Sequence, residues 1–506
     1  MSDATGLSSK LTAVLNTNVW EGGAAIAAGA NDQYLADSIG IDTEKEKRQD
    51  LSVGQEFPTS SVSGGITSEG PIPKMFRFGS KDHLFLALCM GAVSVQYRSK
   101  TALHSGTATG GSATQLDDSA ATFGATDVLV GKTLIIDTGG TARFRVEPIT
   151  ANTGIQVTTA SGNAYAASDT YEICDFGPAF YDICDGTATA NTIKSTIGGL
   201  TVNAHAGSWL HLMTGTGAEH VAGIVSNTAD TFTISGTFAT TPDATTVFEV
   251  MGIAASRVYS IGDLAGKYCT LVNYNNAYFD EYPFAKIHGF KLTGDYNDDL
   301  KIEFTALCDR LVPNSAINTS TAAWSIRELA NSIAMKASTV SILRNAQAGA
   351  ALSSGTPADV AKVNNLEFTY LRPVSSDYRT GAASDDVIEE PIVNDSPEVL
   401  LKYVKPRVDD NTDLVNDNDD TDMKGTLTVT GAALSAHQNR EFVITMPHLE
   451  YKTAKAPIEG RDTIKGTIEY FVNGALAAPS GMTYTDAITI DMVDDYGGNP
   501  LLVGNN

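Results

Sequence analysis

The sequence predicts a mainly β protein: a sandwich or barrel core with one or two flanking helices, and two small β domains inserted into it. Segments in which apolar and polar residues alternate recur along the 506 residues, and such alternation is typical of half-buried strands. The 46 glycines, together with many Ser, Asn and Asp residues, supply turns. A repeated block in the first half indicates the inserted domains. The length predicts two to four domains.

The chain is strongly acidic. Its net charge is −25 at pH 7 and its pI is about 4.6. Lys and Arg are scattered along the sequence and do not form the basic stripe that is typical of proteins that grip nucleic acid. Two interpretations stay open: the acidity keeps the protein soluble, or it provides a surface that does not adhere to polyanions.

The cysteine pattern favours a reducing compartment. The five cysteines include no CxxC pair, and several lie in apolar runs, so we expect buried free thiols. A Cys174–Cys184 disulfide is the alternative for a secreted protein. No signal-peptide pattern and no apolar run long enough for a membrane span is visible. We therefore expect folding in the cytoplasm. The cysteines are Cys89, Cys174, Cys184, Cys269 and Cys308.

The N-terminal region predicts an arm, a strand and a helix. Residues 1–40 are small and polar, and we expect an extended arm held only by partners. The mixed charges of 44–50 predict a solvated strand edge or turn, and 60–66 predict a strand that leads into a loop. Residues 80–90 predict a helix that Gly91 ends. Ser80 is its expected cap, and its apolar face is Leu84, Phe85, Leu88 and Cys89.

Two copies of one block, 101–176 and 177–254, follow with an offset of 76 to 80 residues. Each copy contains about five short strand patterns, enough for a small barrel or sandwich. The matched segments are Gly106–Thr109 with Gly186–Thr189, Gly131–Ile136 with Gly207–Leu212, Ile149–Asn152 with Val225–Asn227, Ile155–Val157 with Phe232–Ile234, and Tyr171–Ile173 with Phe248–Val250.

The segment 280–311 predicts a hairpin. Phe290 and Leu292 lie on its first limb, and Ile302 and Phe304 alternate with polar residues on the second. The alternation slips at Gly289, where we expect a β-bulge. The intervening residues 293–299 are rich in turn formers.

The rest of the chain predicts one more helix and several strands. Residues 321–336 have helical spacing and a capping box. Residues 397–404 fit either a strand or a short helix, and 409–422 predict a solvated acidic loop. Residues 486–506 predict a polar tail after one strand. Further strands are expected at 340–343, 366–371, 425–430, 440–446 and 463–471.

No motif in the sequence predicts catalysis, so we expect no catalytic, cofactor-binding or metal-ligating residues. Phosphate-loop, dinucleotide, HExxH and GxSxG patterns are all missing. The histidines His205, His211 and His220 lack a supporting Cys or carboxylate pattern, and strand-face positions are favoured over a metal site. The acidic runs 295–299 and 417–422 lack the Gly and Glu of a calcium loop, which leaves adventitious Ca²⁺ binding as the alternative.

Four short motifs follow one another in the segments outside the repeats: Ser63–Ile66, Leu84–Gly91, Lys286–Phe290 and Phe442–Tyr451. In these motifs and their order the chain resembles the major tail tube proteins of long-tailed, siphophage-like bacteriophages. The resemblance implies a tail-tube β-sandwich core formed by 41–100 and 255–485, with 1–40 as the arm and 486–506 as the tail. The chain departs from the family's minimal pattern at the inserted repeats, which we expect on the outside.

The resemblance also implies a function. We expect a virion structural protein, not an enzyme, that self-associates into hexameric rings stacked as a tube for genome delivery. Expected partners are the tape measure, tail terminator and baseplate proteins, with double-stranded DNA passing non-specifically. The expected location is the virion tail, assembled in the host cytoplasm. Two alternatives stay open: a receptor- or carbohydrate-binding adhesin or decoration protein, and an enzyme such as a glycosidase with β accessory domains.

Overall fold

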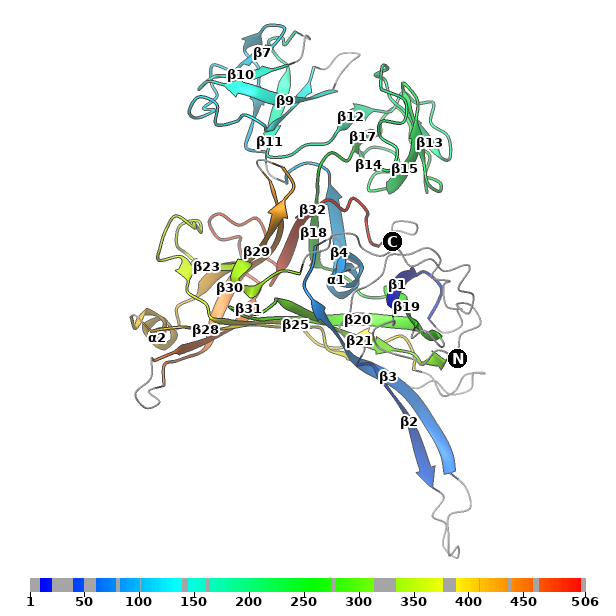
Figure 1. Ribbon diagram of the computed structural model, residues 1–506, viewed down its shortest axis with the longest axis vertical. Helices are drawn as coiled ribbons and strands as arrows, with labels where there is room; N and C mark the ends of the chain where they lie inside the picture. Colours follow the sequence, from blue (N-terminus) through cyan, green and yellow to red (C-terminus); the bar gives the residue numbers. More distant parts are fainter. Residues whose placement is uncertain are drawn as a thin grey trace, which may run out of the picture.

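The computed structural model describes residues 10–20, 40–49, 61–78, 82–100, 102–138, 144–160, 164–274, 279–313, 334–375, 388–408, 410–435, 438–457 and 464–501. Most of these residues are in strands, so the predicted mainly β class with few helices is confirmed. Figure 1 shows a β core with two small β units on one side of it and a two-stranded ribbon that projects from the other side.

A curled sheet forms one wall of the core. Its strands pair antiparallel, each with the next. In spatial order they are β2 (Asp42–Gln49), β3 (Ser61–Met75), β21 (Lys301–Cys308), β20 (Phe279–Asp295), β25 (Asn365–Leu371), β28 (Glu398–Lys405), β31 (Gly466–Asn473) and β30 (Asn439–Lys455).

Strands β20 and β30 are each 17 residues long and continue into a second wall. The first part of β20 pairs with β19 (Tyr268–Tyr274) and β22 (Val312–Pro313), and β19 pairs with β1 (Lys10–Asn16). The first part of β30 pairs with β29 (Met423–Ala433) and β32 (Thr489–Asp494). Strand β32 pairs with β18 (Ala255–Ile261), which pairs in turn with β4 (Gly91–Gln96). Strand β29 pairs with β23 (Val340–Ala346), which pairs in turn with β24 (Val360–Ala361).

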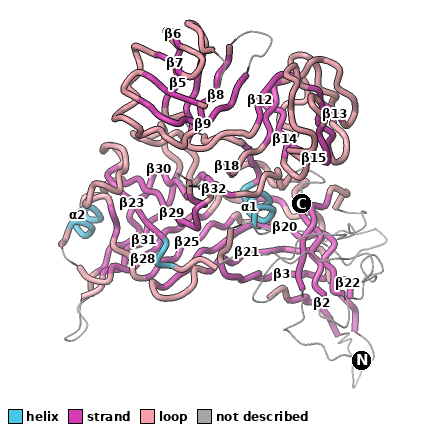
Figure 2. The backbone as a smooth tube through the Cα atoms, turned by 45° about the horizontal axis from the view of Figure 1, so that its top comes forward, coloured by secondary structure: helices cyan, strands magenta, loops and turns pink. Residues whose placement is uncertain are grey.

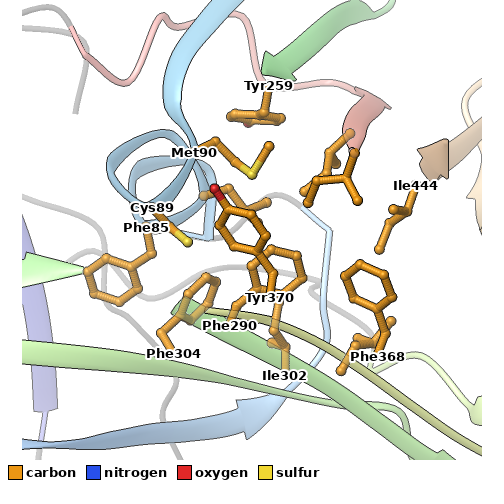
Figure 3. Close-up of a cluster of buried hydrophobic side chains, with 14 of the residues drawn as sticks. Phe85, Cys89, Met90, Tyr259, Phe290, Ile302, Phe304, Phe368, Tyr370 and Ile444 are labelled. Atoms are coloured by element: carbon orange, nitrogen blue, oxygen red, sulfur yellow. The ribbon is translucent and has the colours of Figure 1, made fainter. Parts of the chain in front are cut away.

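Helix α1 (Asp82–Met90) lies inside the curl, and all nine of its residues are buried. The single apolar face predicted for it is therefore too narrow, because sheet surrounds the helix on several sides. Figure 3 shows Phe85 and Met90 among Phe290, Phe304 and Tyr370. Gly91 ends the helix as predicted: its φ is +90°, and a Cβ there would lie 2.7 Å from the carbonyl oxygen of Gly262.

The predicted hairpin is confirmed as β20 and β21. Leu292 pairs with Ile302 and Phe290 with Phe304, all facing the core. The register shifts between Ile287 and Gly289, so the predicted bulge is present.

The two repeats form separate sheets of the same topology (Figure 2). Repeat 1 (101–176) has the order β5-β11-β8-β9-β10-β7-β6, and repeat 2 (177–254) has β12-β17-β14-β15-β16-β13. Each has its own apolar core. The strands are β5 (His104–Thr107), β6 (Gly110–Gly111), β7 (Gln115–Asp117), β8 (Thr133–Asp137), β9 (Phe144–Asn152), β10 (Gln156–Thr159), β11 (Thr170–Cys174), β12 (Phe180–Ile183), β13 (Thr192–Lys194), β14 (Trp209–Thr214), β15 (Val221–Asn227), β16 (Thr231–Ile234) and β17 (Val247–Val250).

Some of the predicted repeat matches are wrong in detail. Val157 pairs with Asn152, and Phe232 pairs with Asn227, so Val157 corresponds to Phe232 and not to Ile234. Gly106 lies within β5, whereas Gly186 follows the corresponding strand β12. Both matches followed short stretches of similar sequence and not the pairing of the strands, which the sequence alone does not show.

One expectation for the ends of the chain is corrected and another is confirmed. Residues 10–16 of the predicted arm form β1 in the core, and the strand expected within 486–506 is β32, whose Ile490 and Met492 are buried. Their alternating apolar residues explain both results, since a strand with one apolar face gains stability by joining the sheet.

Other segments differ less. Residues 61–75 are one continuous strand, and 398–405 is a strand rather than a helix. The predicted helix 321–336 lies mostly outside the described residues, and Ala334 and Lys336 make β-bridges before a 3₁₀ turn, η2 (Ala337–Thr339). A small separate sheet joins β26 (Val374–Ser375) and β27 (Ile392–Val393).

The repeats enter the core at one place. Strands β4 and β18 are antiparallel neighbours, and Gln96 lies opposite Ser256. Residues 97–254 are therefore inserted between two adjacent strands of the core, like the loop of a hairpin.

Candidate assembly and channel surfaces

The outer face of the curled sheet carries charges that alternate in sign from strand to strand. Along β20, β25 and β28 the residues between the core positions point to this face. Lys291 lies opposite Glu303 of β21, and its Nζ is 2.7 Å from Glu367 Oε1 on β25. These residues begin a row that we call the charge ladder: Glu303, Lys291, Glu367, Lys402, Glu469 and Lys452.

The ladder continues across three more strands. Lys402 of β28 lies in register between Glu367 and Glu469. Lys452 Nζ on β30 is 2.7 Å from Glu469 Oε1. Such exposed pairs contribute little to folding stability. The pairs instead balance the charge of the face, because every lysine of the ladder has a carboxylate beside it.

The ribbon formed by β2 and β3 projects beyond the sheet (Figure 1). Strand β3 pairs with β21 only from Ser68 to Met75. Its outer part, from Ser61, pairs with β2 as far as Gln49. An isolated two-stranded ribbon is only marginally stable in water. Beyond Ser68, β3 therefore pairs with β2 alone among the described strands.

A buried polar network fixes α1 to the second wall. His83 Nδ1 lies 2.8 Å from the Tyr259 hydroxyl, and His83 Nε2 lies 2.8 Å from Asp494 Oδ2. Burial opposes ionisation of Asp494, but the Arg257 guanidinium that bonds to it outweighs this effect and holds its pKa below the usual range. Burial, followed by Arg257, lowers the pKa of His83.

This Tyr–His–Asp arrangement resembles the acid–base chain of an enzyme, but all three side chains are sealed from solvent. A catalytic group needs access to its substrate. The network therefore serves to position α1 and β32. Sequence reasoning missed it, because His83 and Asp494 stand in unrelated contexts near opposite ends of the chain.

The predicted acidic loop contains helix α2 (Thr412–Asn418). Its Asp413 is buried and is held by Arg344 and Lys405. Arg344 also donates to the Tyr470 hydroxyl at 2.7 Å. Burial opposes ionisation of Asp413, but these two cations lower its pKa. The expectation of a solvated loop is wrong here, because one carboxylate anchors the segment to β28 and β23.

Lys286 of the resemblance motif is also structural. Its Nζ donates to Glu390 at 2.8 Å and to the Pro391 carbonyl at 2.6 Å. Burial lowers the pKa of its ammonium group. The lysine thus ties β20 to the segment that begins at residue 388.

Repeat 2 is packed onto the core. The Tyr97 hydroxyl donates to the Gly497 carbonyl at 2.6 Å, and its backbone N–H donates to Glu249 at 3.2 Å. Tyr97 belongs to a buried apolar cluster with Met251 and Ala255, against which Trp209 packs. The attachment is therefore a packed interface and not a free linker.

The other predicted candidates are distributed through the fold. His211 pairs with Glu249 at 3.1 Å, while His205 and His220 lie against the rings of Phe232 and Phe238. In the described part of the chain, no group of three or more His, Cys, Asp or Glu residues is arranged to hold a metal. All five cysteines are buried free thiols.

Comparison with protein-family models finds no match for this chain, and comparison with curated proteins finds no similar sequence. Within the described residues no helix is long and apolar enough to cross a membrane.

Proposed function

We propose that this chain is the structural subunit of a viral tail tube, which polymerises as stacked rings around a channel for the genome. The observation that carries the proposal is the arrangement of the charge ladder, the ribbon and the two repeats around one core. The charge ladder lies on the side of the core away from the repeats, and the ribbon projects beyond the sheet (Figure 1).

The charge ladder suits the wall of a channel through which DNA slides. A free lysine on this face would bind phosphate. Lys291 and Lys452 are instead within 2.7 Å of carboxylates, and Lys402 lies between two of them. The pairing leaves the face polar and hydrated without a net attraction for a polyanion.

The ribbon suits contact with a neighbouring subunit. Its outer part needs a further surface to become stable, and a copy of the same chain supplies one in a symmetric assembly. The repeats lie on the opposite side of the core from the ladder, so in a ring whose channel the ladder lines they project outward.

Negative-stain electron microscopy of the full-length protein at low and high concentration tests the proposal. We expect rings or hollow tubes whose number rises with concentration. A variant with a shortened ribbon, in which Glu44 is joined to Thr67 through an Asn-Gly turn, keeps the register of the remaining pairs. We expect it to fold but not to form tubes.

The matched control removes the repeats by joining Gln96 to Ser256 through a short turn, and we expect it to retain assembly. Uniform small particles of the intact protein at every concentration would overturn the proposal. Tubes formed equally well by the shortened-ribbon variant would overturn the role assigned to the ribbon.

A further inference from the structure

Repeat 1 and repeat 2 enclose a groove of about 310 Å³. Its floor is the outer face of the sheet β5-β11-β8, and its far wall is Tyr181 of β12 in repeat 2. Arg98, in the segment that leads from β4 into repeat 1, lines it as well. The volume is at the lower end of the range of about 300 to 1,000 Å³ for small-molecule sites.

The groove has an aromatic wall. The rings of Phe144 and Tyr181 meet edge to face with centroids 4.5 Å apart. The Arg98 guanidinium carbon lies 5.1 Å from the centre of the Tyr181 ring. Burial raises the pKa of Tyr181, so its hydroxyl remains a neutral hydrogen-bonding group. Ile135 adds an apolar patch to the floor.

Hydrogen-bond donors and acceptors are interleaved around this wall. Glu172 accepts from Arg98 at 2.9 Å, and its side chain remains 45% exposed. Asp137 also lines the groove, and so do the hydroxyl residues Ser105 and Thr170. A carboxylate accepts hydrogen bonds only, a guanidinium donates only, and a hydroxyl does both.

The same face makes internal polar contacts in repeat 2. Glu249 occupies the position of Glu172, since His211 lies opposite Glu249 just as Ile135 lies opposite Glu172. In repeat 2 this face is closed: Glu249 is fully buried and holds His211 and the Tyr97 backbone. The equivalent face in repeat 1 is open to solvent at Glu172.

We propose that the groove between the repeats binds a neutral saccharide of one or two sugar units. Each sugar hydroxyl donates one hydrogen bond and accepts others, which matches carboxylates placed beside a guanidinium and hydroxyls. The apolar face of a sugar ring packs on an aromatic side chain, and Tyr181, which is half-buried and backed by the buried Phe144, supplies one.

Other ligand classes fit less well. Asp137 and Glu172 repel a phosphate or other anion. An organic cation would compete with Arg98, which already lies on Tyr181 and Glu172. The inference does not depend on tube formation, because all of the lining residues come from the repeats and the segment that joins them to the core.

The test is a glycan array of neutral and anionic saccharides probed with the full-length protein, followed by calorimetric titration with the best neutral disaccharide. We expect neutral glycans to bind and Glu172→Gln to weaken the affinity by about ten-fold or more, the usual effect of losing a hydrogen bond to a charged group. The control is Glu367→Gln, a similarly exposed carboxylate of the charge ladder, which we expect to leave the affinity unchanged.

A second variant, Tyr181→Phe, keeps the ring packing and removes only the hydroxyl. We expect a smaller loss of affinity from it, and retained folding by circular dichroism. Binding of anionic glycans alone, binding of no glycan, or neutral binding that Glu172→Gln leaves intact would each overturn the proposal. Because the readout is saccharide binding, its failure is distinct from a failure to form tubes.

Discussion

Lys74 and Asp82 form an ion pair in which neither side chain is exposed, with the lysine Nζ 2.8 Å from both carboxylate oxygens. Lys74 lies near the end of β3, and Asp82 begins α1. A carboxylate at a helix N-terminus also interacts favourably with the helix dipole. The pair thus connects the central helix to the strand that continues into the ribbon.

Replacing Lys74 alone with Met is expected to lower the free energy of unfolding by about 3 to 5 kcal/mol, because the variant leaves an uncompensated buried charge. The double variant Lys74→Met with Asp82→Asn removes that charge and should recover much of the loss. Urea unfolding followed by tryptophan fluorescence measures both. A single variant as stable as the original protein would show that the pair is not coupled to folding.

Removing the carboxylates of the charge ladder is expected to create DNA binding. In the triple variant Glu303→Gln, Glu367→Gln and Glu469→Gln the lysines lose their partners, and they become free to contact phosphate. Filter binding with duplex DNA at low salt should detect an affinity that falls steeply as salt rises. The control is Glu172→Gln with Glu219→Gln in the repeats. If the triple variant binds no more DNA than the control, the ladder does not shield its lysines.

Asp309 is expected to give a measurable dependence of stability on pH. Burial raises the pKa of this carboxyl to about 6, compared with about 3.9 in an unfolded chain. The folded protein therefore binds the proton of Asp309 more tightly than the unfolded chain does. The stability that this proton contributes is fully present below pH of about 4 and is lost as the pH rises to about 6.

The expected loss across that window is about 3 kcal/mol. Asp309→Asn should abolish it, so the variant gains stability relative to the original protein at neutral pH but not at pH of about 4. Urea titrations at the two pH values measure this difference, and Asp298→Asn in an exposed turn serves as the control. An unchanged difference between the two pH values in Asp309→Asn would refute the assignment.

Asn152 and Asn227 are expected to stabilise the two repeats separately. Asn152 accepts from the Leu129 N–H at 2.7 Å and donates to the Ala125 carbonyl, while Asn227 accepts from His205 and donates to Thr201. Replacing either with Ala removes hydrogen bonds to backbone groups that are mostly only partly buried, at a cost of about 1 to 3 kcal/mol.

Hydrogen exchange followed by mass spectrometry locates that cost. In Asn152→Ala we expect faster exchange in repeat 1 alone, and in Asn227→Ala in repeat 2 alone, because each repeat has its own core. Equal acceleration in both repeats for either variant would mean that they unfold as one unit.

Local patterns in the sequence predicted local structure well. The alternation around Phe290 and the slip at Gly289 are properties of neighbouring residues, and both the hairpin and its bulge are present. The repeat pattern likewise predicted two small β units, although short stretches of similar sequence misplaced two of its matches.

Features that depend on distant partners were not predictable in this way. Asp413 lies in an acidic run that indicates a solvated loop, and only the fold brings Arg344 and Lys405 to it. The His83–Asp494 contact joins residues near opposite ends of the chain. The strand β32 was expected from its pattern, but its neighbours β30 and β18 were not, because they lie beside it only in space.

The insertion between Gln96 and Ser256 has a consequence for how such a protein can change. Because the chain leaves and re-enters the core at adjacent strand positions, a module inserted between them can be lengthened or exchanged at little more cost to the core than the closure of a longer loop, as long as the packing of Tyr97 and Met251 is kept. The β4–β18 junction is thus a site where one inserted domain can be exchanged for another. In the tube that we propose, an altered or exchanged module there would give the particle a new exterior while the proposed subunit contacts and inner wall stayed as they are.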